Sequence, residues 1–146
     1  MSTPFGALGI RVAEALLSLD FLSSAAHAHA PTTALAREVC AQLRAYLKNP
    51  RHVFDLPLDL NGSPHQERVW SALQCIPSGQ VRTYGMIARK IGSAARAVGA
   101  ACRQNPVPVI VPCHRVVAVS GPGGFMGQSE GRAIGLKRWL LEHERS

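Results

Sequence analysis

The sequence predicts an α+β protein in two parts, a short sheet-and-helix segment over residues 1–60 and a mostly helical segment over residues 61–146. Two strand-like apolar runs and one amphipathic helix occupy the first part. An Asn61-Gly62 turn then separates it from a series of helical patterns that includes a helix-turn-helix. With 146 residues, the chain can form one full domain with a small companion.

The first part begins with a predicted β-hairpin over residues 3–22, with strands near residues 5–10 and 16–22. Residues 25–31 are expected to form a loop. Residues 54–60 read as an extended segment that leads to the second part.

A helix is expected between the loop and the extended segment. Thr32 or Thr33 can cap its start, and Asn49-Pro50 ends it. Its apolar residues recur every four positions, as one buried face requires: Leu35, Val39, Leu43 and Leu47.

The second part opens with a helix whose start is well specified. Ser63 is the expected cap, Pro64 suits the first helical position, and Gln66 completes a capping box. The buried face is expected to contain Val69, Leu73 and Ile76, with Trp70 and Cys75 as core neighbours.

The next two helices form the predicted helix-turn-helix. Residues 85–92 make the first helix, with Gly92 as the turn, and Ser93 is expected to cap a second helix from Ala94 to about Arg103. Arg96 and Arg103 lie on a different face from the inward stripe, which is expected to be Ala95, Val98 and Cys102. Many such helix pairs bind nothing, so the pattern alone leaves the function open.

The charge is concentrated in the second part. Residues 61–146 carry eleven basic and four acidic side chains, which account for the whole net charge of +7, whereas residues 1–60 are neutral. A solvated basic surface is one interpretation. A field of one sign across half of a small protein favours a polyanionic partner, and nucleic acid is the commonest one inside cells.

The composition also indicates where the protein acts. No apolar run is long enough to cross a bilayer, and the N-terminus lacks the features of a secretion signal. The cysteines at positions 40, 75, 102 and 113 have no metal-binding spacing and are expected to be reduced thiols. We therefore expect a cytoplasmic protein, nucleoid-associated if bacterial, without a metal, a cofactor or a membrane partner.

The candidate chemistry lies in the proline-bounded apolar run of residues 105–116, which reads as extended and buried. It sets the thiol of Cys113 directly against the imidazole of His114. The thiolate is the nucleophilic form of cysteine, and a neighbouring base can generate it. An isolated Cys-His pair is more often a small buried residue beside a surface histidine.

The last helix supplies a third group. Leu136, Leu140 and Glu144 recur at four-residue steps, so Glu144 continues an apolar stripe toward the interior. A buried carboxylate needs a partner, and a histidine is a natural one. The alternative is a frayed chain end that leaves Glu144 in solvent.

Read together, these segments resemble the methylated-DNA–protein-cysteine methyltransferases, also called O6-alkylguanine-DNA alkyltransferases. The resemblance covers roughly residues 59–146. It is carried by residues 59–64, Ile76-Pro77-Ser78-Gly79, Thr83-Tyr84, residues 95–99, Asn105-Pro106-Val107-Pro108, residues 112–117 and residues 139–144.

The resemblance implies roles for particular residues. Cys113 would irreversibly accept an alkyl group from O6 of guanine, or from O4 of thymine, once per molecule. His114 would act as the base through a water, and Glu144 would orient it. Asn105 would position the cysteine, and Tyr84 would protonate the departing guanine.

The resemblance also implies a fold and a partner. The first part would be a ribonuclease-H-like sheet and helix. The second helix of the helix-turn-helix would enter the minor groove of double-stranded DNA. The protein would act as a monomer. Arg96 would fill the gap that a flipped-out base leaves. The implied DNA contacts are Arg96, Ser93, Ala94, Arg103 and Arg115. The implied substrate pocket is lined by Pro108, Phe125, Met126 and Gly127.

Other functions fit fewer of these features. A non-catalytic sensor of alkylated DNA, of the alkyltransferase-like type, usually has tryptophan at the position of Cys113. A cysteine hydrolase would have no use for a basic helix-turn-helix. A transcription factor would keep the helices without the order of thiol, imidazole and carboxylate.

Overall fold

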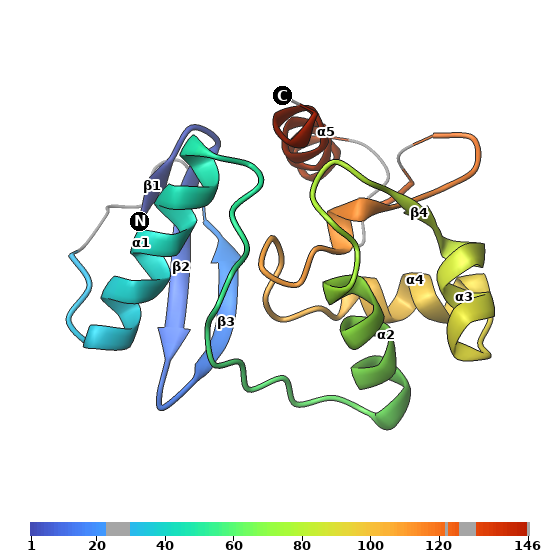
Figure 1. The fold of residues 1–146 in the computed structure, drawn as a ribbon, viewed down its shortest axis with the longest axis horizontal. Helices are drawn as coiled ribbons and strands as arrows, with labels where there is room; N and C mark the ends of the chain where they lie inside the picture. Colours follow the sequence, from blue (N-terminus) through green and yellow to red (C-terminus); the bar gives the residue numbers. More distant parts are fainter. Residues whose placement is uncertain (23–29, 122, 126–130, 146) are drawn as a thin grey trace. The chain divides into compact units, whose positions relative to one another are not determined.

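A computed structural model describes residues 1–22, 30–121, 123–125 and 131–145 (Figure 1). By contacts between Cα atoms, the chain divides into two units, Met1–Leu60 and Asn61–Ser146. Among the described residues, the first unit contains a three-stranded sheet and one α-helix, and the second contains four α-helices. The predicted α+β class is confirmed.

The sheet of the first unit contains the predicted hairpin. Strand β2 (Gly6–Val12) pairs antiparallel with β3 (Leu16–Phe21), with Leu8 opposite Phe21 and Ile10 opposite Leu19. A short strand that we did not predict, β1 (Ser2–Thr3), adds to the other edge of β2. The predicted loop at residues 25–31 lies mostly outside the described residues.

Helix α1 (Ala34–Lys48) contacts β2 and covers the sheet with part of the predicted apolar face. Thr33 caps it by accepting a hydrogen bond from the amide of Ala36, and it ends at Asn49 as predicted. Its buried residues are Val39, Cys40, Leu43 and Tyr46. Leu35 and Leu47 are only half-buried, because they lie in the first and last turns of the helix.

The extended segment after α1 is held by the sheet. The Leu16 amide donates to the Pro57 carbonyl at 2.8 Å, and the Asp59 amide donates to the Leu16 carbonyl at 3.0 Å. These two bonds join residues 57–59 to the start of β3.

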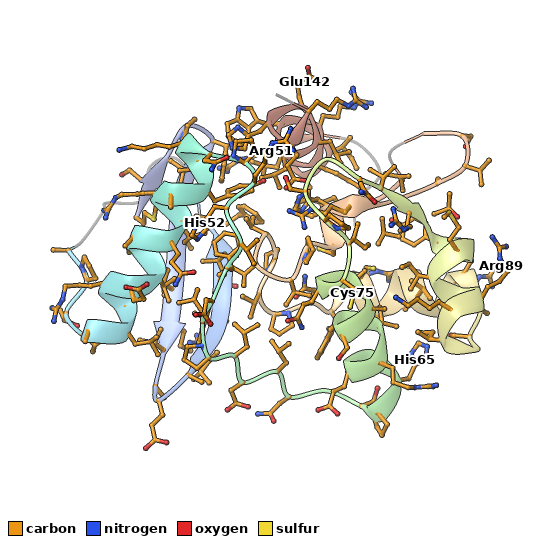
Figure 2. All side chains as sticks on the ribbon, in the orientation of Figure 1. Arg51, His52, His65, Cys75, Arg89 and Glu142 are labelled. Atoms are coloured by element: carbon orange, nitrogen blue, oxygen red, sulfur yellow. The ribbon has the colours of Figure 1, made fainter. Side chains whose placement is uncertain are left out.

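The second unit begins with α2 (Pro64–Gln74), which has the predicted capping box. Trp70 is buried and its indole N–H donates to the Ala101 carbonyl at 2.9 Å. The expectation that Cys75 lies in the core is wrong. Cys75 is the residue that caps the C-terminus of α2, where the chain leaves the packed face, and its thiol is exposed (Figure 2).

Helices α3 (Tyr84–Ile91) and α4 (Ala95–Arg103) form the helix-turn-helix, with Gly92 in the left-handed conformation at φ 68°. Ser93 does not cap α4, since its hydroxyl hydrogen-bonds to His65 Nε2 at 2.7 Å and Ala94 occupies the cap position. The buried residues of α4 are Val98 and Ala101.

The inward stripe of α4 therefore differs from the one predicted. Ala95 is exposed and Cys102 is half-buried. The bond from Trp70 to the Ala101 carbonyl turns that side of α4 toward α2, which moves Ala95 away from the core.

The segment from Asn105 to Val116 is buried as predicted from Val107 onward, whereas Asn105 and Pro106 are half-buried, and it is not extended throughout. Its middle is a tight turn in which Val109 has φ 75°, a value that a β-branched residue rarely adopts. The Asn105 side chain brackets this turn by donating to the Val111 carbonyl at 2.8 Å and accepting from the Val107 amide at 2.9 Å.

The same segment continues into the 3-10 turn η1 (Cys113–Arg115) and then β5 (Val116–Val117), which pairs in parallel with β4 (Arg82–Thr83). Helix α5 (Arg132–Glu144) completes the unit and contacts η1. None of the helices in the described residues combines the length and the apolar character needed to cross a bilayer.

The bond between α2 and α4 gives a test of this packing. Replacing Trp70 by Phe should lower the free energy of unfolding by about 1–3 kcal/mol, because it removes the buried indole hydrogen bond and leaves the Ala101 carbonyl only the longer bond, at 3.2 Å, from the Gln104 amide. Urea unfolding measures the loss. Val119 is 92% exposed, so Val119→Ala should change stability by less than about 0.5 kcal/mol. An equally small effect of Trp70→Phe would contradict the packing role.

Candidate active site

Cys113 opens the η1 turn directly after Pro112, and its amide donates to the Val111 carbonyl at 2.8 Å. The residue is 6% exposed. The turn lies between the loop that Asn105 brackets and the paired strands β4 and β5, so both sides of the cysteine are held by hydrogen bonds. The backbone that carries the thiol is therefore held in place.

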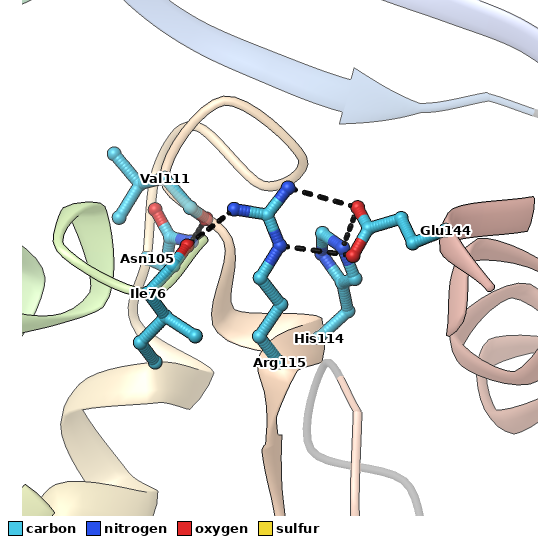
Figure 3. Close-up of polar contacts among 6 residues, drawn as sticks. All are labelled: Ile76, Asn105, Val111, His114, Arg115 and Glu144. Atoms are coloured by element: carbon cyan, nitrogen blue, oxygen red, sulfur yellow. Dashed lines mark hydrogen bonds and ion pairs between the residues drawn. The ribbon is translucent and has the colours of Figure 1, made fainter. Parts of the chain in front are cut away.

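The residue that follows the cysteine is part of a buried imidazole–carboxylate pair. His114 Nε2 is 2.7 Å from a carboxylate oxygen of Glu144, which is the last residue of α5 (Figure 3). His114 is fully buried and Glu144 is 5% exposed. Glu144 is therefore buried and paired, and the alternative of a frayed chain end that leaves it in solvent is wrong.

Arg115 is the second partner of this carboxylate. Its guanidinium donates to both oxygens of Glu144 at 2.9 Å and to the Ile76 carbonyl at 2.6 Å (Figure 3). Arg115 is only 9% exposed, so its expected place among the DNA contacts is corrected: its donors are directed inward. Two bonds from one planar guanidinium fix the carboxylate more firmly than a single bond would.

The charges of this pair follow from their surroundings. Burial opposes the ionisation of Glu144, but hydrogen bonds from His114 and Arg115 outweigh burial and lower the pKa of Glu144 to about 2. Burial lowers the pKa of His114 more than the carboxylate raises it. At neutral pH the pair is therefore an ionised carboxylate beside a neutral imidazole.

This protonation state decides which nitrogen is basic. A neutral imidazole that donates its Nε2–H to Glu144 carries its lone pair on Nδ1. Within the described part of the chain, no group hydrogen-bonds to the buried Nδ1. His114 can therefore accept a proton at Nδ1.

The thiol itself is held in its protonated form. Burial raises the pKa of Cys113, and the hydrogen bond from Asn105 and the charge of Lys137 only partly offset that effect. Formation of the thiolate therefore needs a base, and these two neighbours stabilise the thiolate once it forms.

Lys137 is a site residue that the sequence reasoning missed. It is fully buried in α5, and its ammonium donates to the carbonyls of Val116 at 2.6 Å and Gly124 at 2.9 Å. Burial lowers its pKa to about 8. A signal was present in the sequence, since Lys137 lies seven residues before Glu144 and hence on nearly the same face of the helix.

Tyr84 begins α3 and faces the same group of residues. Its hydroxyl donates to the Gly124 carbonyl at 3.4 Å, and the Lys137 Nζ atom lies 5.8 Å from its ring centroid. Burial raises the pKa of Tyr84 to about 12, so the phenol keeps its proton at neutral pH. Tyr84 can therefore act as a proton donor.

The remaining predicted residues divide into three groups. Arg96, Arg103 and Ala94 are exposed on or beside α4, and Ser93 is half-buried against His65. Pro108 and Phe125 are buried. Met126 and Gly127 lie outside the described residues.

Comparison with known proteins points to one family. The model of the DNA binding domain of 6-O-methylguanine DNA methyltransferase matches residues 64–146. The methylated-DNA–protein-cysteine methyltransferase of Mycobacterium tuberculosis is 50% identical over 108 residues, which cover 72% of this chain. The match spans only 62% of that relative. The constitutive enzyme of this name from Bacillus subtilis is 37% identical and matches 98% of this chain and 92% of its own length.

Solved structures agree over the whole chain. The crystal structure of Mycobacterium tuberculosis OGT in complex with DNA superimposes with a TM-score of 0.84 at 41% identity, covering 99% of this chain and 90% of that one. The structure of the R37L variant of the same species' O6-methylguanine methyltransferase gives a TM-score of 0.85 at 39% identity.

The two lowered pKa values predict a loss of stability in acid. The unfolded chain binds a proton on His114 below about pH 6.5 and on Glu144 below about pH 4.5, while the folded protein binds each only at lower pH. Because the unfolded state binds more protons, the free energy of unfolding falls as the pH drops through these ranges, and the Glu144 contribution is lost between about pH 4.5 and 2.

Urea unfolding of Glu144→Gln from pH 7 to pH 2 tests this assignment. The variant should be less stable by roughly 3 kcal/mol at pH 7, because Arg115 loses its charged partner, and its stability should fall less steeply below pH 4.5. Glu142 pairs with Arg145 on the surface, so Glu142→Gln should keep the wild-type pH dependence (Figure 2). Parallel pH curves for wild type and Glu144→Gln would refute the assignment.

Proposed function

The chain belongs to the 6-O-methylguanine DNA methyltransferase family, and on that premise we propose that it repairs DNA by moving an alkyl group from O6 of guanine to Cys113. The observation that carries the proposal is a buried thiol next to an imidazole whose other nitrogen is fixed by a carboxylate. The same chemistry extends to O4 of alkylated thymine. The presence of Cys113 disfavours a non-catalytic lesion sensor.

The first step is removal of the thiol proton. We assign it to His114 Nδ1 through one bridging water, since Nε2 is engaged with Glu144. The ionised Glu144 stabilises the imidazolium that results, and Arg115 holds the carboxylate in place. Asn105 and the Lys137 ammonium stabilise the thiolate.

The second step is attack of the thiolate on the alkyl carbon. The bond from sulfur to carbon forms as the bond from carbon to guanine O6 breaks, and its electron pair passes into the guanine ring. Tyr84 gives its proton to the guanine, which leaves as a neutral base, and the proton on His114 returns to the phenolate through solvent. The product is a thioether, which water does not displace at ordinary rates, so each molecule reacts once.

DNA recognition is assigned to the exposed face of α4 in the unit Asn61–Ser146. Arg96 and Arg103 supply positive charge there, and the small residues Gly99 and Ala100 let the helix approach the minor groove closely. A guanine in a duplex must be flipped out to reach a buried thiol, and Arg96 fills its place. We place this reaction in the cytoplasm, with the protein acting as a monomer.

Intact-mass measurement after incubation with a duplex that contains O6-methylguanine tests the proposal. The protein should gain one methylene at Cys113, with no more than one equivalent of DNA repaired per molecule. Cys113→Ala should transfer nothing, because the acceptor is gone. Cys75→Ala, which removes an exposed thiol, should behave as wild type. Repair beyond one equivalent, or any demethylation by Cys113→Ala, would falsify the mechanism.

The role of Arg96 is tested by comparing two substrates. Arg96→Ala should slow transfer from the methylated duplex by about 10–100-fold, because base flipping costs a few kcal/mol, and should affect the free base O6-benzylguanine far less. Arg138→Ala removes an exposed positive charge from α5 and controls for net charge. Equal losses on both substrates would show that Arg96 shapes the pocket instead.

A further inference from the structure

Gly123 lies against the ring of Tyr84 with almost no space between them. A Cβ atom at position 123 would be 3.0 Å from Tyr84 Cε2, 3.1 Å from its hydroxyl oxygen and 3.2 Å from the Ala118 amide nitrogen. Gly123 also has φ 75°, which residues with a side chain rarely adopt. Both facts favour glycine here, but only the first involves the candidate active site.

The residue that follows Gly123 accepts hydrogen bonds from two polar side chains. The Gly124 carbonyl accepts from the Tyr84 hydroxyl at 3.4 Å and from the Lys137 ammonium at 2.9 Å. On its other side, the Tyr84 ring lies 3.9 Å from the place a Cβ of Gly99 would take, which is ordinary contact. The ring is thus confined between α4 and the backbone at positions 123–124.

From this geometry we propose that Gly123 is a positioning residue that sets the place of the Tyr84 hydroxyl in the transfer reaction. The inference rests on the proposed function. In the step where the bond from carbon to O6 breaks, Tyr84 must deliver its proton to the guanine as the electron pair arrives. A side chain at position 123 pushes the ring and its hydroxyl away from the Gly124 carbonyl and misplaces that proton.

This role differs from two others that a glycine can have. If only the positive φ mattered, a substitution would strain the backbone wherever such a glycine occurs. If the loop merely needed small residues, any glycine in it would be equivalent. Two glycines in the described residues serve as controls for these cases. Gly131 has φ 86° and controls for backbone strain, and Gly121 lies in the same loop and controls for the need for small residues. A Cβ at either position meets no described atom within 4 Å.

The first experiment compares alanine at these three positions by single-turnover transfer from O6-benzylguanine, with melting temperatures measured in parallel. Gly123→Ala should slow transfer by on the order of 10–100-fold, as expected for a misplaced catalytic group. Gly121→Ala should react like wild type, and Gly131→Ala should lose stability without a comparable loss of rate. A wild-type rate for Gly123→Ala, or an equal loss of rate for Gly131→Ala, would overturn the inference.

The second experiment asks whether Gly123 acts through Tyr84. In a Tyr84→Phe background, where no hydroxyl remains to be misplaced, Gly123→Ala should slow transfer by less than about threefold. The same loss in both backgrounds would overturn the inference. If Gly123→Ala does not fold, Gly123→Ala/Tyr84→Ala removes the opposing ring and should restore folding, and a double variant that stays unfolded would count against the contact.

These outcomes separate the inference from the proposed function. If wild type transfers no alkyl group to Cys113, the proposed function fails and the positioning role fails with it. If wild type reacts and the two substitutions are additive, the proposed function stands and only the role of Gly123 is lost.

Discussion

The buried carboxylate of Glu144 is the group on which the rest of the site depends. It is the last residue of α5, and it accepts hydrogen bonds from His114 and Arg115, two neighbours in the η1 turn. An unpaired carboxylate in this position would cost several kcal/mol, so the end of α5 and the η1 turn must meet for either to be stable. Burial keeps the imidazole neutral, and the contact with Glu144 at Nε2 leaves its lone pair on Nδ1. Stability and chemistry therefore rely on one interaction.

A second cluster of the site is centred on a backbone carbonyl, that of Gly124. The Gly124 carbonyl accepts from both Lys137 and Tyr84, and Lys137 also reaches the carbonyl of Val116 in β5. A buried ammonium is tolerated because each of these carbonyls gives it a partner. Two cations, Lys137 and Arg115, thus lie in the interior, and the charge of Lys137 favours the thiolate of Cys113. Helix α5 supplies Lys137 and Glu144, and so aligns the two clusters through its own geometry.

Local sequence rules determined much of the fold. The capping box of α2, the proline and glycine boundaries and the apolar periodicities of α1, α2 and α5 depend on neighbours within one or two turns. The helices whose bounds were predicted, α1, α3 and α4, appear within a residue or two of those bounds. The inward direction of Glu144 also followed from spacing. The predicted core position of Cys75, the cap at Ser93 and the inward face of Ala95 were wrong, because the end of α2, the contact with His65 and the packing of Trp70 decide them.

The sequence by itself determined the α+β class, the helix-turn-helix, the pairing of thiol and imidazole, and the family resemblance. Only the tertiary structure decided that Arg115 turns inward to Glu144, that the segment before Cys113 contains a tight turn, and that the buried charge of Lys137 acts on the thiol. Each of these depends on contacts between residues at least 20 positions apart or on one backbone torsion, and periodicity carries no information about either. The residue types therefore predicted the chemistry of the site, while the buried groups that set its charges depended on how distant segments pack.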